Sequence, residues 1–203
     1  HLPWSSVFTI TALFMLPGLV LTLAVDEPRQ ARAGPRSLRD AVVEPFREFL
    51  RRDGWRQAGL ILLFIFLYKL GDSMATALAT PFYLDMGFTK SEIGIIAKNA
   101  GLWASVAGGM LGGLWMLRIG INRGLWLFGV VQVVSILGFA WLAFEARPDK
   151  VLLAFVIAFE ALGVGLGTAA FTAFIARATD PRFTATQFAL FTSLAAVPRT
   201  VVN

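Results

Sequence analysis

Five long apolar blocks dominate this sequence, and each has the length of a membrane-spanning helix. They cover approximately residues 4–25, 57–81, 94–117, 124–144 and 151–176. At 1.5 Å per residue, roughly 20 helical residues cross about 30 Å of bilayer hydrocarbon. A sixth apolar block begins near Phe183 and is still running at Asn203. We therefore expect an all-α fold, a polytopic bundle of transmembrane helices.

The composition agrees with a lipid environment and excludes several kinds of functional site. Hydrophobic residues make up 57% of the 203 residues and charged residues only 15%, and the arginines border the apolar blocks. The net charge of +5 therefore does not indicate a nucleic-acid partner. With no cysteine and a single histidine, the chain offers no disulfide and no metal-ligand cluster. The lipid bilayer is the expected partner, and we expect no cofactor.

The polar segment 26–56 predicts the orientation of the chain in the membrane. It holds eight arginines, whereas loop 82–93 holds a single basic residue. Because strongly basic loops remain in the cytoplasm, segment 26–56 should be cytoplasmic. Alternation then places loops 82–93 and 145–150 outside the cytoplasm, and the connections 118–123 and 177–182 inside it.

A single span, a long basic loop and several further spans are typical of the middle of a two-bundle transporter. We predict that residues 1–25 are the last transmembrane helix of an N-terminal half, and that 26–56 form a cytoplasmic interdomain loop. Residues 57–203 would then be the bundle of the C-terminal half, with a truncated last span at 183–203. The chain would be an internal fragment, and its partner would be the missing N-terminal half of the same polypeptide.

The middle of segment 26–56 has apolar residues at helical spacing. The spacing of three to four residues between them places them on one side of a helix: Val42, Val43, Phe46, Phe49 and Leu50. This pattern indicates an amphipathic helix that lies at the membrane interface. The alternative is a solvated tether, because linkers between membrane bundles are often simply charged.

Ionisable side chains within the apolar blocks are candidates for function, because each costs about 2.5–3.5 kcal/mol at the centre of a spanning helix. Lys69 and Asp72 are three residues apart, so they share a helix face and can form an ion pair. Such a pair can be a structural clamp or part of a proton or substrate relay. Glu160 has no opposite charge nearby in the sequence, so its partner is another helix, a substrate or a proton. It is the preferred proton-coupling candidate, with packing against a neighbouring helix as the alternative.

Other polar side chains in the apolar blocks are candidates for substrate binding. Lys98 and Asn99 lie in the first turns of the third block, and Gln132 lies in the fourth. Gln187 is near the start of the last one. Facing a cavity, these groups can bind hydroxyls, carboxylates or amides. For Lys98 the alternative is a side chain that reaches to the membrane interface.

Glycines in the third block form two overlapping G-x-x-x-G pairs, which allow close packing of helix backbones. The four residues are Gly108, Gly109, Gly112 and Gly113. Gly163, Gly165 and Gly167 line the fifth block, but no strand precedes them and their spacing does not fit a dinucleotide site. The chain also lacks the G-x-x-x-x-G-K-[ST] motif of ATP-driven systems. We interpret the glycines as packing residues.

The segment between the third and fourth blocks resembles the cytoplasmic loop signature of the major facilitator superfamily. It reads GLWMLRIGINR at residues 113–123, with Arg118, Gly120 and Arg123 at the gating positions. The family's acidic residue is replaced by Leu117. Three longer strings look like the AmpG muropeptide permeases: LYKLGDSMA at 67–75, GFTKSEIG at 87–94 and ATQFALFTS at 185–193.

This resemblance implies a proton symporter that imports N-acetylglucosaminyl-anhydro-N-acetylmuramyl peptides from periplasm to cytoplasm for peptidoglycan recycling. The chain would hold about spans six to eleven of twelve in the bacterial inner membrane, and the N-terminal half would complete the cavity. The resemblance implies that the partners are a glycopeptide substrate and protons. We therefore expect the substrate to be bound by Lys69, Lys98, Gln132 and Gln187. We expect proton coupling by Asp72 and Glu160.

Three other functions compete with this interpretation. Acetyl-CoA transporters form a related branch, although a phosphate-bearing ligand favours more cavity lysines and arginines than the chain contains. A membrane sensor that transports nothing is the second alternative. An integral-membrane enzyme is the third, but no nucleophile, base and orienting group occur at a usable spacing, so we do not expect an enzyme.

Overall fold

The computed structural model describes residues 3–25, 37–145 and 148–202. In these ranges the chain is helical with short connections and contains no strand, which confirms the all-α prediction. The chain divides into two compact units, residues 1–34 and 35–203. We describe the two units separately. Residues 26–36, which belong to the predicted interdomain loop, and Arg147 of the predicted outer loop lie outside the described residues.

The first unit contains two short apolar helices, α1 (Trp4–Leu13) and α2 (Leu16–Ala24). Pro17 occupies the first turn of α2, where its missing N–H group would have no helical partner in any case. Together the two helices form a candidate membrane span of 21 residues, Trp4–Ala24. No side chain of either helix is buried, and the surface of this span is mainly apolar, with a few serines and threonines. Its position agrees with the predicted first span at 4–25.

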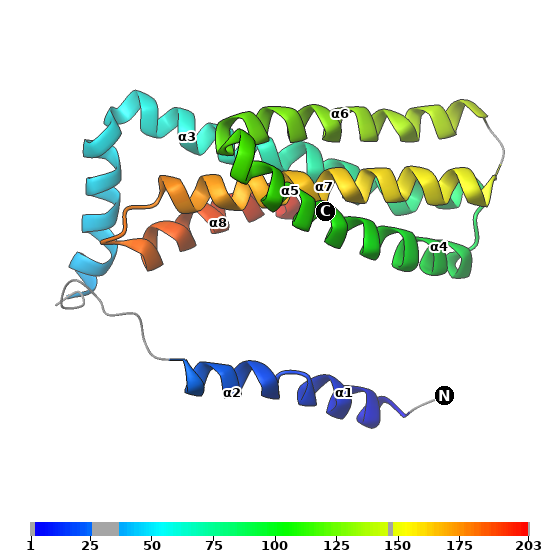
Figure 1. Ribbon diagram of the computed structural model, residues 1–203, viewed down its shortest axis with the longest axis horizontal. Helices are drawn as coiled ribbons and strands as arrows, with labels where there is room; N and C mark the ends of the chain where they lie inside the picture. The colour runs from blue at the N-terminus through cyan, green and yellow to red at the C-terminus, as the bar shows by residue number, and fades with distance from the viewer. Residues whose placement is uncertain (1–2, 26–36, 146–147, 203) are drawn as a thin grey trace. The chain divides into compact units, whose positions relative to one another are not determined.

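The second unit is a bundle of long helices with α7 between α5 and α6 (Figure 1). A π-helical turn, η1, joins α4 to α5. Helices α5 and α6 pack mainly on α7, whereas α8 packs mainly on α3. The elements are α3 (Leu38–Asp85), α4 (Lys90–Ile96), η1 (Ala97–Gly101), α5 (Leu102–Ile119), α6 (Ile121–Glu145), α7 (Lys150–Ala178) and α8 (Thr184–Val202).

In the described part of the chain, five helical segments are long and apolar enough to cross a membrane, and each corresponds to one predicted span. Four belong to the second unit: Gly54–Asp85, Lys90–Ile119, Ile121–Glu145 and Lys150–Ala178. They extend beyond the predicted blocks because the helices continue into their polar flanks. The predicted sixth span also forms a helix, α8, of 19 residues, but α8 is not among the five apolar candidates.

Helix α3 consists of two parts that meet at Gly54. This glycine has φ 74° and ψ 160°, a conformation that side chains disfavour, so the chain turns there. We call residues 38–53 the arm; the remainder, Gly54–Asp85, is the span. The arm runs across the end of the bundle, whereas the span runs along it (Figure 1). The solvated tether is therefore wrong for residues 38–53, which form a helix.

The arm packs on the start of α8. Phe49 is 2% exposed, and its ring lies edge-on to Phe191 with the centroids 5.1 Å apart. The Thr186 hydroxyl donates a hydrogen bond to the Ala41 carbonyl at 3.0 Å. Val42, Val43 and Phe46 remain exposed. The arm is thus amphipathic as predicted, but α8 covers only part of its apolar surface.

Close packing of α5 on α7 depends on glycines. Gly108 lies against the backbone of Leu162, and a Cβ atom at Gly112 would lie 3.1 Å from the Cα of Leu166. From the other side, a Cβ at Gly165 would lie 2.8 Å from the amide nitrogen of Gly109. Cβ atoms at Gly109 and Gly113 would meet nothing within 4 Å. The pair Gly108 and Gly112 therefore faces α7, whereas the other predicted pair, Gly109 and Gly113, does not have a close neighbour at its Cβ positions.

Replacing Gly108 by alanine tests this packing. The new Cβ would collide with the Leu162 backbone, which cannot rotate away, so the two helices must separate. We expect Gly108→Ala to destabilise the full-length parent protein by roughly 1–3 kcal/mol, visible as a lower melting temperature in detergent.

The matched control is Gly94→Ala on α4, where a Cβ meets nothing within 4 Å. There the better helix propensity of alanine should leave the stability unchanged or raise it by up to about 1 kcal/mol. Equal melting temperatures for Gly108→Ala and the unsubstituted protein would contradict the packing role.

Candidate functional site

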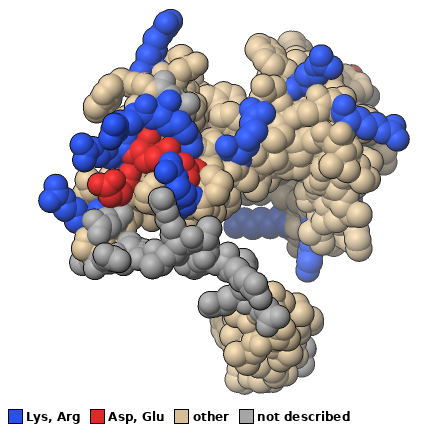
Figure 2. Space-filling view, turned by 60° about the vertical axis from the view of Figure 1, so that its left-hand side comes forward, with Lys and Arg blue, Asp and Glu red and all other residues tan. Residues whose placement is uncertain are grey.

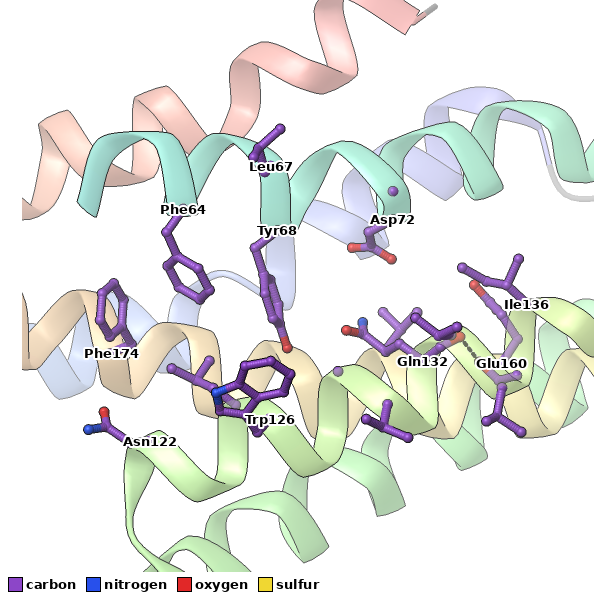
Figure 3. A pocket seen from close by; sticks show the side chains of 18 of the residues that line it. Phe64, Leu67, Tyr68, Asp72, Asn122, Trp126, Gln132, Ile136, Glu160 and Phe174 are labelled. Carbon is purple, nitrogen blue, oxygen red and sulfur yellow. Dashed lines mark hydrogen bonds between the residues drawn. The ribbon is translucent and has the colours of Figure 1, made fainter. Parts of the chain in front are cut away.

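A cavity of about 900 Å³ opens between α3, α6 and α7 (Figure 3). Its lining is mainly apolar, with Phe64 and Trp126 among its larger side chains. Polar side chains from all three helices interrupt this lining, including Asp72 of α3, Gln132 of α6 and Glu160 of α7 (Figure 3). Three of the predicted site residues, far apart in the sequence, therefore lie around one cavity.

Lys69 and Asp72 form the predicted ion pair. The Lys69 Nζ atom lies 2.9 Å from Asp72 Oδ2, and both side chains are largely buried. Lys69 also donates to the Thr168 hydroxyl of α7 at 3.5 Å and lies 5.5 Å from the centroid of the Phe171 ring. The ammonium group therefore links α3 to α7. Asp72 lines the cavity, whereas Lys69 approaches α7 from the other side of the pair.

Glu160 is half-buried and lines the same cavity. Within the described residues it has no hydrogen bond and no ion pair, so the predicted packing partner on a neighbouring helix is not found there. The Tyr68 hydroxyl is buried, likewise with no hydrogen-bond partner among the residues that the structure describes. The Tyr68 ring stacks on Phe171 with 5.2 Å between centroids, which holds the hydroxyl at the cavity wall (Figure 3).

Gln132 sits where α6 and α7 approach closely. A Cβ atom at Gly167 would lie 2.7 Å from the Gln132 side-chain amide, so only a glycine leaves room for that side chain. The Ser135 hydroxyl donates to the Gln132 carbonyl at 2.8 Å. Gly163 lies against the same turn of α6. The glycines of α7 therefore determine where Gln132 can lie.

Lys98 lies outside the cavity lining, in the π-helical turn η1. A π turn widens the helix by one residue and occurs frequently at functional sites. The Asn99 amide donates back to the Ile95 carbonyl at 2.8 Å, so it satisfies part of this turn. Lys98 itself is exposed and has no partner among the residues that the structure describes.

Gln187 does not line the cavity; it lies in the junction between the arm and α8. Its side chain is 1% exposed and makes three hydrogen bonds. Its amide nitrogen donates to the Pro45 carbonyl at 2.9 Å and to Glu48 Oε2 at 2.8 Å, and its oxygen accepts from the Asp180 amide at 2.7 Å. The prediction that Gln187 faces the cavity is therefore wrong. The sequence could not show this, because the contact between the arm and α8 joins residues more than 130 positions apart.

Charged side chains surround this junction. Asp180 accepts hydrogen bonds from the Arg182 backbone and side chain, at 2.7 Å for the backbone and 2.8 Å for Nη2. Arg182 lies 3.7 Å from Glu48, and Arg52 donates to the Ala178 carbonyl at 2.6 Å. Figure 2, which looks toward this end of the bundle, shows acidic side chains grouped among basic ones. The cluster joins the arm to the turn between α7 and α8.

Residues 1–202 match the Major Facilitator Superfamily. The chain belongs to this superfamily. It is 38% identical to the anhydromuropeptide permease of Escherichia coli K12 over 203 residues, covering 100% of this chain and 40% of that permease. It is 50% identical over 209 residues to an uncharacterized protein of Haemophilus influenzae, covering 99% of this chain and 49% of that protein. The chain thus spans less than half the length of these relatives.

Together with the five apolar helices, this membership shows that the chain is a multi-pass segment of an inner-membrane protein. The loop between α5 and α6 is the one that resembles the loop signature of the superfamily. Gly120, with φ 78°, is the single residue between the two helices, so its conformation reverses the chain. Arg118 and Arg123 flank it, are exposed, and have no partner within the described ranges. The nearby Arg177 donates to the Asn122 side chain at 2.6 Å, which ties this loop to α7.

Sequence reasoning missed three polar residues of the facilitator bundle: Tyr68, Thr168 and Arg199. Tyr68 and Thr168 become notable only through their contacts with the cavity and with Lys69. Arg199 had a signal in the sequence, because it is a charged residue in an apolar block. Thr168 also lines a second groove, of about 640 Å³ between α5 and α7, together with Ser105, Gly109 and Thr172.

The charge cluster at the arm predicts a pH dependence of stability. Hydrogen bonds from Arg182 hold the pKa of the Asp180 carboxyl well below its usual range. The ionised form therefore stabilises the fold above the unfolded-state pKa of about 3.9, and this contribution is lost as the pH falls toward the lowered native pKa. We expect Asp180→Asn to lower the melting temperature of the full-length protein at pH 7. The difference from the unsubstituted protein should shrink below about pH 4.

A difference that stays constant between pH 7 and pH 3 would show that the carboxylate charge does not matter there. In that case the substitution would act only by disturbing the hydrogen bonds between residue 180 and Arg182.

Proposed function

We propose that the parent protein is a secondary transporter that imports anhydro-muropeptides from the periplasm to the cytoplasm by proton symport. The observation that carries the proposal is the 38% identity, over the whole of this chain, to a relative named anhydromuropeptide permease. Because the chain covers 40% of that relative, the activity belongs to the full-length protein, with both helical halves. The role is transport for peptidoglycan recycling, and not enzymatic conversion of the substrate.

For substrate binding we propose Lys69 and Lys98. A muropeptide carries hydroxyls, amides and carboxylates, which require polar partners along the path. Lys69 is near the Thr168 hydroxyl of α7, and Lys98 is exposed within a membrane helix. A cation in that position is costly in lipid, which supports a water-filled or substrate-filled neighbourhood. Gln187 is not part of this proposal, because its hydrogen bonds are used at the arm.

For proton coupling we propose Asp72 and Glu160. The two carboxylates line one cavity from neighbouring helices, and only Asp72 has a described cationic partner. Gln132 of α6 lines the same cavity, and its side-chain amide can hydrogen-bond either protonation state of a carboxyl group. An unpaired carboxylate in an apolar cavity is the arrangement that proton pumps and symporters use for proton relay.

Uptake by membrane vesicles tests the proposal. Vesicles that carry the full-length protein should accumulate a labelled anhydro-muropeptide when a proton gradient is imposed, and a protonophore should abolish the accumulation. Vesicles without the protein are the control. Folded, abundant protein with no accumulation would refute the substrate, while accumulation insensitive to the protonophore would refute proton symport.

Substitutions that remove the charge test whether the two cavity carboxylates couple uptake to protons. We expect Glu160→Gln and Asp72→Asn to reduce gradient-driven uptake at least tenfold without lowering the membrane abundance of the protein, because neither side chain can then release a proton. Glu44→Gln, at an exposed position on the arm, is the matched control. Normal uptake by both cavity variants would remove these carboxylates from the mechanism.

A further inference from the structure

Helix α8 is long enough to span much of a membrane, yet it is not among the five apolar candidate spans. Polar side chains lower its mean hydropathy: Gln187 among them is buried, whereas Thr192, Ser193, Arg199 and Thr200 are exposed. Polar and charged groups in a membrane helix avoid lipid and face water or protein. The Thr192 and Thr200 hydroxyls donate to carbonyls of α8 itself, at 2.8 Å each, so the charged side chain of Arg199 is the group that requires a polar environment.

The exposed surface of α8 has a polar side and an apolar side. Thr192, Ala196 and Arg199 follow one another at spacings of four and three, so they share one helix face. Val197 and Val201, which are 40% and 73% exposed, share another face, to which Ser193, four residues before Val197, also belongs. The third side is buried, with Phe191 packed on the arm. The Arg199 charge therefore lies on a different face of α8 from the two exposed valines.

Arg199 is an uncompensated cation on the polar side. It is exposed, and in the part of the chain that the structure describes it has no ion pair and no hydrogen bond. Counted along α8, it lies roughly 22 Å from Thr184, the first residue of the helix. Lys69 lies at a similar distance from Gly54, but its charge is balanced by Asp72.

We propose that Arg199 binds a carboxylate of the transported solute, on a face of α8 that lines the water-filled path. The inference rests on the proposed transport function and adds a substrate-binding residue to it. A guanidinium group is planar and forms two parallel hydrogen bonds with a carboxylate, so it selects this group over neutral amides. The small side chain of Ala196, one turn away, leaves room beside it.

The first experiment asks which side of α8 faces water. Single cysteines replace Ala196 or Val197 in the full-length protein, in a background without other cysteines, and a charged, water-soluble methanethiosulfonate reagent is added to protein in lipid nanodiscs. We expect rapid labelling of Ala196→Cys and at least tenfold slower labelling of Val197→Cys. Equal rates, or no labelling of Ala196→Cys, would overturn the inference.

The second experiment asks what Arg199 binds. The probes are a labelled anhydro-muropeptide with free peptide carboxylates and the same compound with those carboxylates converted to carboxamides. We expect Arg199→Gln to weaken binding of the carboxylate probe by about 10- to 100-fold, with little change for the carboxamide probe. Arg199→Lys should restore part of the loss. Arg47→Gln, at an exposed position on the arm, is the control and should bind both probes normally.

An equal loss for both probes, or no loss, would overturn the role of Arg199. Equal loss together with a lower melting temperature would assign Arg199 to an ion pair with another segment of the parent protein. If the unsubstituted protein binds neither probe, the proposed substrate is refuted. The labelling rates at Ala196→Cys and Val197→Cys then decide by themselves whether the water-lined face exists.

Discussion

The bundle depends on the close approach of α7 to its two neighbours. In lipid, helices gain nothing from hiding apolar surface from water, so they associate through backbone packing and a few polar contacts. Here glycines allow that approach: Gly108 lies against the backbone of Leu162, and Gly167 lies beneath the Gln132 side chain. Because α7 is held in this way, Glu160 projects into the cavity between α3 and α6, and Thr168 reaches Lys69.

The distribution of charge follows from the same packing. Lys69 and Asp72 neutralise each other at the α3–α7 contact, so this pair contributes to the assembly of the helices. Lys98, Glu160 and Arg199 have no such compensation among the described residues. An unpaired charge in a membrane helix is costly, and it persists where a solute, a proton or another part of the protein supplies the partner. We therefore assign transport roles to these three unpaired groups, and we also assign such roles to Lys69 and Asp72, whose ion pair borders the same cavity.

The arm adds a second polar assembly at one end of the bundle. Gly54 turns the chain, Phe49 anchors the arm on α8, and Gln187 connects the arm to the turn that precedes α8. A buried amide with all its hydrogen bonds satisfied favours one arrangement over others, because any displacement leaves buried polar groups without partners. The start of α8, and with it the polar face that carries Arg199, is thereby held in place.

The sequence by itself determined the helices, the positions of the five spans and the pairing of Lys69 with Asp72, because hydropathy and helical spacing are local properties. Only the tertiary structure decided which of the glycines face a neighbouring helix, since Gly108 and Gly109 are indistinguishable in a motif. It also placed Gln187 at the arm and brought Asp72, Gln132 and Glu160 around one cavity. Those positions depend on which faces of the helices pack against each other, and this packing is determined by contacts between residues far apart in the sequence.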